Sequence, residues 1–289
     1  MADKKRLSSN VPGDFYVNSA CIDCDTCRQL APASFSAVGG YSAVTKQPET
    51  EEELRFAGHA LVSCPTAAIA SESKEGLAAA MADFPLQLDA GVYYCGFTSA
   101  KSYGGSSYFI HRPGEGNWLI DAPRWVPALA RRFEEMGGIE TIFLTHRDDI
   151  ADAALYAERF GAKRIIHEAE RSAQPDAEHV IQGVKPVDWS DEFRIIPVPG
   201  HTPGHIVLLY QSRYLFAGDH LEWDRDLQEL GAYPDYCWYS WTEQTKSMAR
   251  LAQESFEWVL PGHGTRVKLP KSEMKAAMER LVERMRQTG

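Results

Sequence analysis

Four of the six cysteines are spaced as ligands for one metal centre. Cys21, Cys24 and Cys27 form a C-x2-C-x2-C run, and Cys64 follows later with a proline directly after it. Such a run can wrap three corners of a cubane iron–sulfur cluster, while a distant cysteine supplies the last thiolate. A zinc ion with thiolate ligands is the alternative. The third cysteine of the run and the Cys-Pro segment favour a [4Fe–4S] cluster.

Histidines and aspartates form a second candidate site, because they follow predicted strands. His146 and Asp148 come after the strand 141–144, and three later strands are followed by His201, Asp219 and His263. Residues that end strands project into loops at one edge of a sheet, where open α/β folds place their sites. We therefore expect these side chains to meet at one sheet edge.

The elements that must position these residues are short strands that alternate with helices. The strands are rich in β-branched and aromatic residues, and Gly137 and Gly161 are well placed to end helices. The predicted strands are 108–110, 118–120, 141–144, 164–166, 193–196, 206–210, 214–216 and 258–260, and the predicted helices are 127–136, 151–160, 242–253 and 271–286. This alternation predicts an α/β domain of roughly 200 residues.

The chain of 289 residues is longer than a typical single domain, and its content changes near residue 84. All the clustered cysteines precede that point, whereas eight of the nine histidines follow it. A short predicted helix at 77–82 ends before Pro85 and marks the boundary. The predicted domains are therefore 1–84, with the cysteine cluster, and 85–289, with the histidines and aspartates.

Charge and hydropathy limit the partners of the protein. Asp and Glu number 40 against 30 Lys and Arg, a formal net charge of −10, so neither nucleic acid nor a membrane surface is an expected partner. No apolar run approaches the roughly 18 residues that cross a bilayer, and the N-terminal residues lack the apolar core of a signal peptide. Clustered free cysteines are typical of a reducing compartment, so we expect a cytoplasmic protein.

The N-terminal segment resembles the single-cluster bacterial ferredoxins. The resemblance covers residues 16–70 and includes Gly39-Gly-Tyr-Ser-Ala-Val and Pro65-Thr-Ala-Ala-Ile-Ala. It implies a small ferredoxin-like α+β domain whose [4Fe–4S] cluster is bound by Cys21, Cys24, Cys27 and Cys64.

Residues 90–270 resemble the metallo-β-lactamase-fold hydrolases, which hold one or two metal ions in an αββα sandwich. The resemblance rests on Thr-His146, Gly-His201-Thr-Pro-Gly-His205, Gly-Asp219-His220 and Gly-His263, in the order of the family's motifs. It implies metal ligands at His146, His201 and His263, with Asp219 as a bridge. The chain is thus identified as a ferredoxin-like domain fused to a metallo-β-lactamase-fold domain, an α/β (α+β) architecture.

The first motif departs from the family pattern T-H-x-H-x-D-H. Asp148 stands where the second histidine belongs, and Ile150 and Ala151 occupy the Asp-His positions. If the chain instead loops out two residues, Asp152 takes the aspartate position and Ala153 the histidine position. At least one imidazole is missing in either alignment, and a carboxylate in the place of an imidazole shifts the preference from zinc towards iron or manganese.

The resemblance suggests a workable assembly of two metal ions. One ion is held by His146, Asp148 and His201, and the other by Asp152 and His263, with Asp219 between them. We expect one or two divalent ions, iron or zinc, with manganese as a further option.

Three functions are open from the sequence. The first, which is the usual chemistry of the fold, is hydrolysis of an ester, lactone or thioester. Asp148 or Asp152 would orient the attacking water, and His205 or His220 would steady the oxyanion. The second is a redox enzyme in which the cluster, fed by a redox-protein donor, passes electrons to a diiron-type site. The third is an electron-transfer protein with a degenerate metal site, for which Ala153 is the main argument.

Two further stretches are candidates for contact with a small-molecule substrate. Residues 101–107 precede a predicted strand, and the aromatic-rich residues 230–241 follow Asp219. The aromatic side chains could wall an apolar pocket near the metal, or they could belong to the core.

Overall fold

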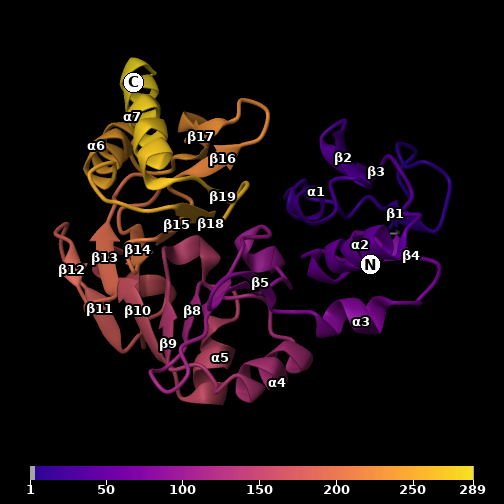
Figure 1. Ribbon diagram of the computed structural model, residues 1–289, viewed down its shortest axis with the longest axis horizontal. Helices are drawn as coiled ribbons and strands as arrows, with labels where there is room; N and C mark the ends of the chain where they lie inside the picture. Colours follow the sequence, from indigo (N-terminus) through magenta and orange to yellow (C-terminus); the bar gives the residue numbers. More distant parts are fainter. Residues whose placement is uncertain (1–3, 289) are drawn as a thin grey trace. The chain divides into compact units, whose positions relative to one another are not determined.

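The computed structural model describes residues 4–288 and divides into two compact units; Figure 1 labels most of their helices and strands. The first unit contains the chain up to Ile139 together with Ala151–Phe160. The second contains Glu140–Ile150 and the chain from Gly161 onward. The predicted domain boundary between residues 84 and 85 falls inside the first unit and remains a prediction.

The N-terminal part of the first unit is a small α+β arrangement. Its elements are β1 (Phe15–Val17), α1 (Thr26–Leu30), β2 (Phe35–Val38), β3 (Tyr41–Val44), α2 (Glu51–Ser63), β4 (Ile69–Ser71) and α3 (Leu77–Ala82). β1 pairs antiparallel with β4, and β2 pairs antiparallel with β3. α2 begins with a capping box between Thr50 and Glu53, which satisfies two backbone N–H groups that the helix leaves free. It ends before the Cys64-Pro65 pair because a residue that precedes proline disfavours helical geometry.

Apolar side chains from these elements enclose the cysteine-rich loop. Phe15, Phe35 and Ile69 are buried together, and Cys27 and Cys64 belong to the same buried cluster. The cysteines are therefore held by a packed core, which limits the exposure of any cluster bound to them.

The rest of the first unit is an antiparallel meander with helices packed on it. The elements are β5 (Leu86–Asp89), β6 (Val92–Tyr94), the 3₁₀ turn η1 (Ala100–Ser102), β7 (Tyr108–Ile110), β8 (Trp118–Ile120), α4 (Pro127–Glu135) and α5 (Ala153–Phe160). The Phe133 ring of α4 lies 4.7 Å from the Phe109 ring of β7 and 6.0 Å from the Tyr156 ring of α5, measured between centroids. These aromatic contacts join α4 to the meander and α5 to α4.

The second unit contains a parallel group of strands and a larger, mostly antiparallel sheet. The parallel strands are β9 (Thr141–Phe143), β10 (Lys163–His167) and β11 (His179–Ile181). The larger sheet has the order β12 (Val187–Asp188), β13 (Phe193–Pro197), β14 (Ile206–Tyr210), β15 (Tyr214–Gly218), β18 (Trp258–Pro261) and β19 (Val267–Lys268). Only its β15–β18 pair is parallel among the strands described.

Short turns, a hairpin and two helices complete the second unit. They are η2 (Arg147–Asp149), η3 (Glu168–Ala173), β16 (Glu222–Asp224) with β17 (Glu229–Gly231), η4 (Pro234–Tyr236), α6 (Trp241–Leu251) and α7 (Lys271–Gln287). α6 and α7 lie side by side in Figure 1. Their apolar faces pack on the large sheet, where Met248 and Met278 share a buried cluster with Leu215 and Val259.

Burial of apolar side chains explains why β14, β15 and α7 form at the predicted positions. Every residue of β14 and β15 is buried, so these strands read as continuous apolar runs with no alternation. The predicted helix 271–286 is observed as α7, and its buried residues, such as Met274 and Leu281, recur at helical spacing. Among residues 4–288, no helix has the length and apolar character that a membrane span requires.

The buried centre of the large sheet should set the stability of the second unit. We expect Leu215→Ala to lower the free energy of unfolding by about 3 kcal/mol, because a fully buried leucine is replaced by a cavity. Urea unfolding followed by circular dichroism measures this loss. The matched control is Leu227→Ala, since Leu227 is 66% exposed and should change stability by less than about 0.5 kcal/mol. Equal effects of the two changes would contradict the assigned core.

Candidate iron–sulfur site and metal centre

The four clustered cysteines line a single cavity in the first unit. Cys21 and Cys24 lie in the loop before α1, Cys27 lies within α1, and Cys64 caps the C-terminus of α2. The loop turns sharply because Asp23 and Asp25 adopt positive φ angles of 58° and 65°. Tertiary folding thus brings the distant Cys64 to the run predicted from the sequence.

The surroundings of the sulfurs suit a cluster. Backbone N–H groups of Asp23 and Ser42 each donate to Cys21 Sγ at 3.4 Å, and the N–H of Ala68 donates to Cys64 Sγ at 3.2 Å. Such donors stabilise the negative charge of thiolates and of cluster sulfur. Burial raises the pKa of the Cys27 thiol to about 12, so that its thiolate would depend on bound iron.

Residues outside the cysteine motif hold the cysteine-bearing loops. Tyr103 Oη donates to the carbonyl oxygen of Ile22 at 2.6 Å, and Arg124 Nη1 donates to the carbonyl oxygens of Cys64 and Thr98 at 3.0 and 2.9 Å. Residues 101–107 were a predicted substrate contact, and the structure places Tyr103 of this stretch against the cysteine loop. No sequence pattern singles out Arg124, because its partners are backbone carbonyls.

Gly104 approaches the cluster site most closely from this stretch. It has a φ of +90°, and a Cβ at this position would lie 2.7 Å from Cys24 Cβ. Both the backbone conformation and the space therefore require glycine here.

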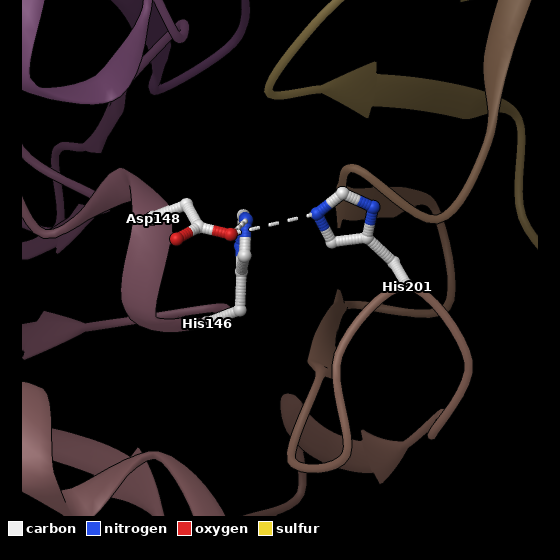
Figure 2. A group of neighbouring side chains, drawn as sticks. All are labelled: His146, Asp148 and His201. Carbon is white, nitrogen blue, oxygen red and sulfur yellow. Dashed lines mark ion pairs between the residues drawn. The ribbon is translucent and has the colours of Figure 1, made fainter. Parts of the chain in front are cut away.

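The histidines and aspartates of the second unit converge as predicted from the strand ends. His146 follows β9, His201 follows β13, Asp219 follows β15 and His263 follows β18, while Asp148 lies on η2. Figure 2 shows His146, Asp148 and His201 pointing toward one another.

One oxygen of Asp219 lies at the centre of this group. Its Oδ2 is 3.5 Å from His146 Nε2, 3.6 Å from His201 Nε2 and 3.8 Å from His263 Nε2. Asp148 Oδ2 lies 3.8 Å from the Nε2 atoms of both His146 and His201. The first ligand set is therefore two imidazoles and two carboxylates.

A second ligand set forms around Asp149. Asp149, which is 2% exposed, places its Oδ1 3.8 Å from His263 Nε2 and groups closely with His146 and Asp219. A Cβ on Gly262 would lie only 2.5 Å from Asp149 Oδ2 and from Asp219 Oδ1, so the glycine makes room for both carboxylates. His146 and Asp219 both lie within reach of the two sets.

Buried polar atoms show that the residues fit metal ions. Within residues 4–288, Asp219 Oδ1 and His201 Nε2 are buried and have no hydrogen-bond partner, which is costly unless a cation compensates. His201 Nδ1 donates to the carbonyl oxygen of Tyr236 at 2.6 Å, so the lone pair of Nε2 faces the site. Burial alone would raise the pKa of Asp219, but the charges of His263, His146 and His201 hold it well below its ordinary value.

The predicted catalytic histidines are buried beside the centre. His205 Nε2 accepts the backbone N–H of Asp219 at 3.1 Å, which fixes the peptide that carries the shared carboxylate. Burial, together with neighbouring histidines, holds the pKa of His205 well below its ordinary value, and burial lowers the pKa of His220 to about 3. Both rings are therefore neutral at pH 7, and their catalytic roles remain predictions.

Asp152 is engaged by other groups in the first unit. Its Oδ1 lies 2.6 Å from Lys101 Nζ, and its Oδ2 accepts the backbone N–H of Trp125 at 2.7 Å. Its role as a ligand or base remains a prediction.

Asp149 was not predicted as a ligand. The two consecutive aspartates that follow His146 and Arg147 were the sequence signal that could have indicated it.

A cavity of about 530 Å³ opens beside the first ligand set. Asp148 and His201 line it, together with Arg147, Thr202, Pro203, Trp238 and Tyr239. Part of the predicted aromatic segment 230–241 therefore walls the site and is not core.

Comparisons with known proteins give matches for both parts of the chain. The family model of the 4Fe-4S single cluster domain of ferredoxin I matches residues 17–71. The hydroxyacylglutathione hydrolase of Rhizobium etli is 30% identical over 188 residues, which are 58% of this chain and 70% of that protein. The same enzyme from Mesorhizobium japonicum is 31% identical over 118 residues, 39% of this chain and 46% of that protein. The chain thus spans about half the length of several curated relatives it matches.

Solved structures share the fold at low identity. A metallo-β-lactamase family protein from Thermus thermophilus has a TM-score of 0.51 and 17% identity, over 70% of this chain and 81% of that chain. A metallo-β-lactamase from Pontibacter korlensis has a TM-score of 0.50 and 16% identity, over 69% of this chain and 97% of that chain. The predicted architecture, with its [4Fe–4S] domain, is confirmed.

The role of Gly104 can be tested on cluster content. We expect Gly104→Ala to lose most of its iron and acid-labile sulfide, because the added Cβ would displace Cys24. Gly114→Ala is the matched control, since Gly114 has a similar φ of +80° but nothing within 4 Å of the added atom. Similar sulfide contents in the two variants would show that Gly104 does not shape the cluster site.

The shared carboxylate can be tested on the second metal. Loss of a residue that hydrogen-bonds to a metal ligand typically lowers metal affinity roughly 10–100-fold. Because Asp219 is itself a candidate ligand, we expect Asp219→Asn to lower the affinity by more than this. Elemental analysis of anaerobically purified protein and competition with a chelator measure this, with Asp191→Asn, an exposed carboxylate, as the control. Asp149→Asn should also reduce the metal content, and full retention there would exclude Asp149 as a ligand.

Proposed function

Because this chain belongs to the metallo-β-lactamase-fold hydrolases and carries a single-cluster 4Fe–4S domain, we propose that it is a metal-dependent hydrolase of a thioester. The observation that carries the proposal is the position of Asp219 Oδ2 within 3.8 Å of three imidazole nitrogens, beside an open cavity. Hydroxyacylglutathione hydrolases are the relatives that this chain matches in sequence, which favours a thioester over an ester or lactone.

The metal ligands and Asp148 have different roles in the proposed hydrolysis. Divalent ions bound by the two ligand sets would polarise the substrate carbonyl and make water more acidic. Asp148 lines the cavity with its side chain 51% exposed, so it can orient a water molecule and accept its proton. The neighbouring His201 and His146 hold the pKa of Asp148 below its ordinary value, so its carboxyl group is ionised at pH 7.

Buried hydrogen bonds keep the ligands in place during this chemistry. His201 is oriented by the Tyr236 carbonyl, and the Asp219 peptide by His205. Preorganised groups of this kind need little rearrangement when charge develops on the carbonyl oxygen. His205 therefore serves as a positioning residue in the proposed mechanism.

The carboxylate-rich ligand sets support a second candidate, a cluster-coupled redox enzyme. Asp148 and Asp149 add oxygen ligands where the family pattern has nitrogen, which favours iron over zinc. In that case a redox-protein partner would reduce the [4Fe–4S] cluster. The third candidate, a protein with a degenerate site, has less support because Asp149 adds a buried carboxylate near His263.

We also place the protein in the cytoplasm. All six cysteines are free, and an oxidising compartment would favour disulfides and loss of the cluster.

Release of thiol from a thioester tests the proposed function. We expect the anaerobically purified holoprotein to hydrolyse a simple acyl thioester, and a chelator that strips the second metal to abolish the reaction. Asp219→Asn should lower kcat by at least about 100-fold, while Asp191→Asn remains as active as the parent. Cys24→Ser should lose the cluster yet keep hydrolysis.

Two results would overturn this proposal. The first is a fully metal-loaded protein that releases no thiol from any thioester. The second is activity that requires reduction of the cluster, which would instead support the redox enzyme.

A further inference from the structure

Exposed aromatic side chains cluster beside the metal centre. Four described aromatic side chains are more than half exposed, and three of them fall within four consecutive residues. Those three are Tyr236, at 65%, Trp238, at 66%, and Tyr239, at 54%. Large apolar groups on a surface mark binding sites when they gather in this way. Trp238 and Tyr239 both line the cavity next to His201.

The backbone of this aromatic segment is tied to the metal ligand itself. The N–H groups of Trp238 and Tyr239 donate to the carbonyl oxygen of His201 at 3.0 and 3.1 Å. The N–H of Ser240 donates to the carbonyl oxygen of Gly200 at 3.0 Å. The aromatic rings are therefore presented from a fixed backbone, although they are open to solvent.

The Trp238 ring is close enough to the centre to hold part of a reacting molecule. Its centroid lies 6.1 Å from that of the His201 imidazole, with an interplanar angle of 62°. If a planar group of the substrate stacked on Trp238, the bonds next to that group would lie near His201 and Asp148. Aromatic stacking would then position the scissile carbonyl.

The charges around the cavity argue against an anionic substrate. Arg147 is the only cationic residue among those that line it, and its guanidinium pairs with Glu170, whose side chain is buried. Arg147 also donates to the Ala169 carbonyl oxygen at 3.1 Å, and Glu170 accepts the Gly204 N–H at 2.7 Å. The positive charge is thus already neutralised. Asp148, the other charged residue that is not a histidine, adds no positive charge to the lining.

We propose that the substrate is a thioester with an uncharged aromatic group that stacks on Trp238, and that glutathione thioesters are disfavoured. This inference rests on the proposed function. The reaction adds water to the thioester carbonyl and breaks the carbon–sulfur bond, giving a carboxylate, a proton and a thiol. Glutathione carries two carboxylates, and the cavity lining offers them no unpaired cation.

Four probes and one set of variants test the inference on the holoprotein. The probes are the phenylacetyl and acetyl thioesters of N-acetylcysteamine, S-benzyl thioacetate and S-lactoylglutathione. We expect kcat/KM to be at least about tenfold higher for an aromatic probe than for the acetyl thioester or the glutathione probe. The phenylacetyl and S-benzyl probes distinguish an aromatic acyl group from an aromatic thiol.

The variants assign any preference to Trp238. Trp238→Ala should lower the ratio of kcat/KM for the preferred aromatic probe to kcat/KM for the acetyl thioester about tenfold, whereas Trp238→Phe should keep most of that ratio. Trp189→Ala, which removes a partly exposed tryptophan elsewhere in the second unit, is the matched control. A preference for S-lactoylglutathione, or an equal loss on all probes in Trp238→Ala, would overturn the inference and leave the proposed function standing.

Binding of an uncleavable probe separates the two proposals. We expect N-ethyl-2-phenylacetamide to bind the holoprotein by calorimetry and to bind Trp238→Ala at least about tenfold more weakly. If no thioester is cleaved but this binding pattern holds, the hydrolase proposal fails and the aromatic site stands. If the amide binds the two proteins equally, the aromatic site is wrong.

Discussion

Three imidazole nitrogens lie within 3.8 Å of one carboxylate oxygen, Oδ2 of Asp219. A carboxylate with so little access to water is stable only where positive charge offsets the loss of its hydration. The second unit is organised to meet this requirement, because each histidine reaches Asp219 from the end of a different strand. Two of the strands behind this group, β14 and β15, are buried along their whole length, and β15 itself leads to Asp219.

The iron–sulfur site of the first unit is positioned by backbone conformation. Its ligands come from one short run and one helix end, so the loop conformation, including positive φ at Asp23 and Asp25, does most of the positioning. Backbone N–H groups supply the compensating polarity, and Arg124 and Tyr103 hold the loops through main-chain carbonyls. The site therefore depends on backbone geometry, whereas the metal centre depends on the charges of side chains.

The segment from Tyr236 to Ser240 connects the metal centre to its cavity. Its first carbonyl orients the His201 ring, its next N–H groups hold the His201 peptide, and its side chains line the cavity. The backbone of this segment therefore contacts the ligand, while its exposed side chains form the substrate surface.

The residue types and spacing were enough to predict the cluster cysteines, most strands and helices, and the convergence of His146, His201, Asp219 and His263. These features follow from local periodicity and from the rule that strand ends meet at a sheet edge. Local spacing does not decide which of Asp148, Asp149 and Asp152 faces the centre. The 3₁₀ turn η2 presents Asp148 and Asp149, and buries the latter, while Asp152 contacts Lys101 and Trp125. Only the tertiary structure decided these contacts, and those of Arg124, because they join groups far apart in the chain whose proximity depends on how whole elements pack.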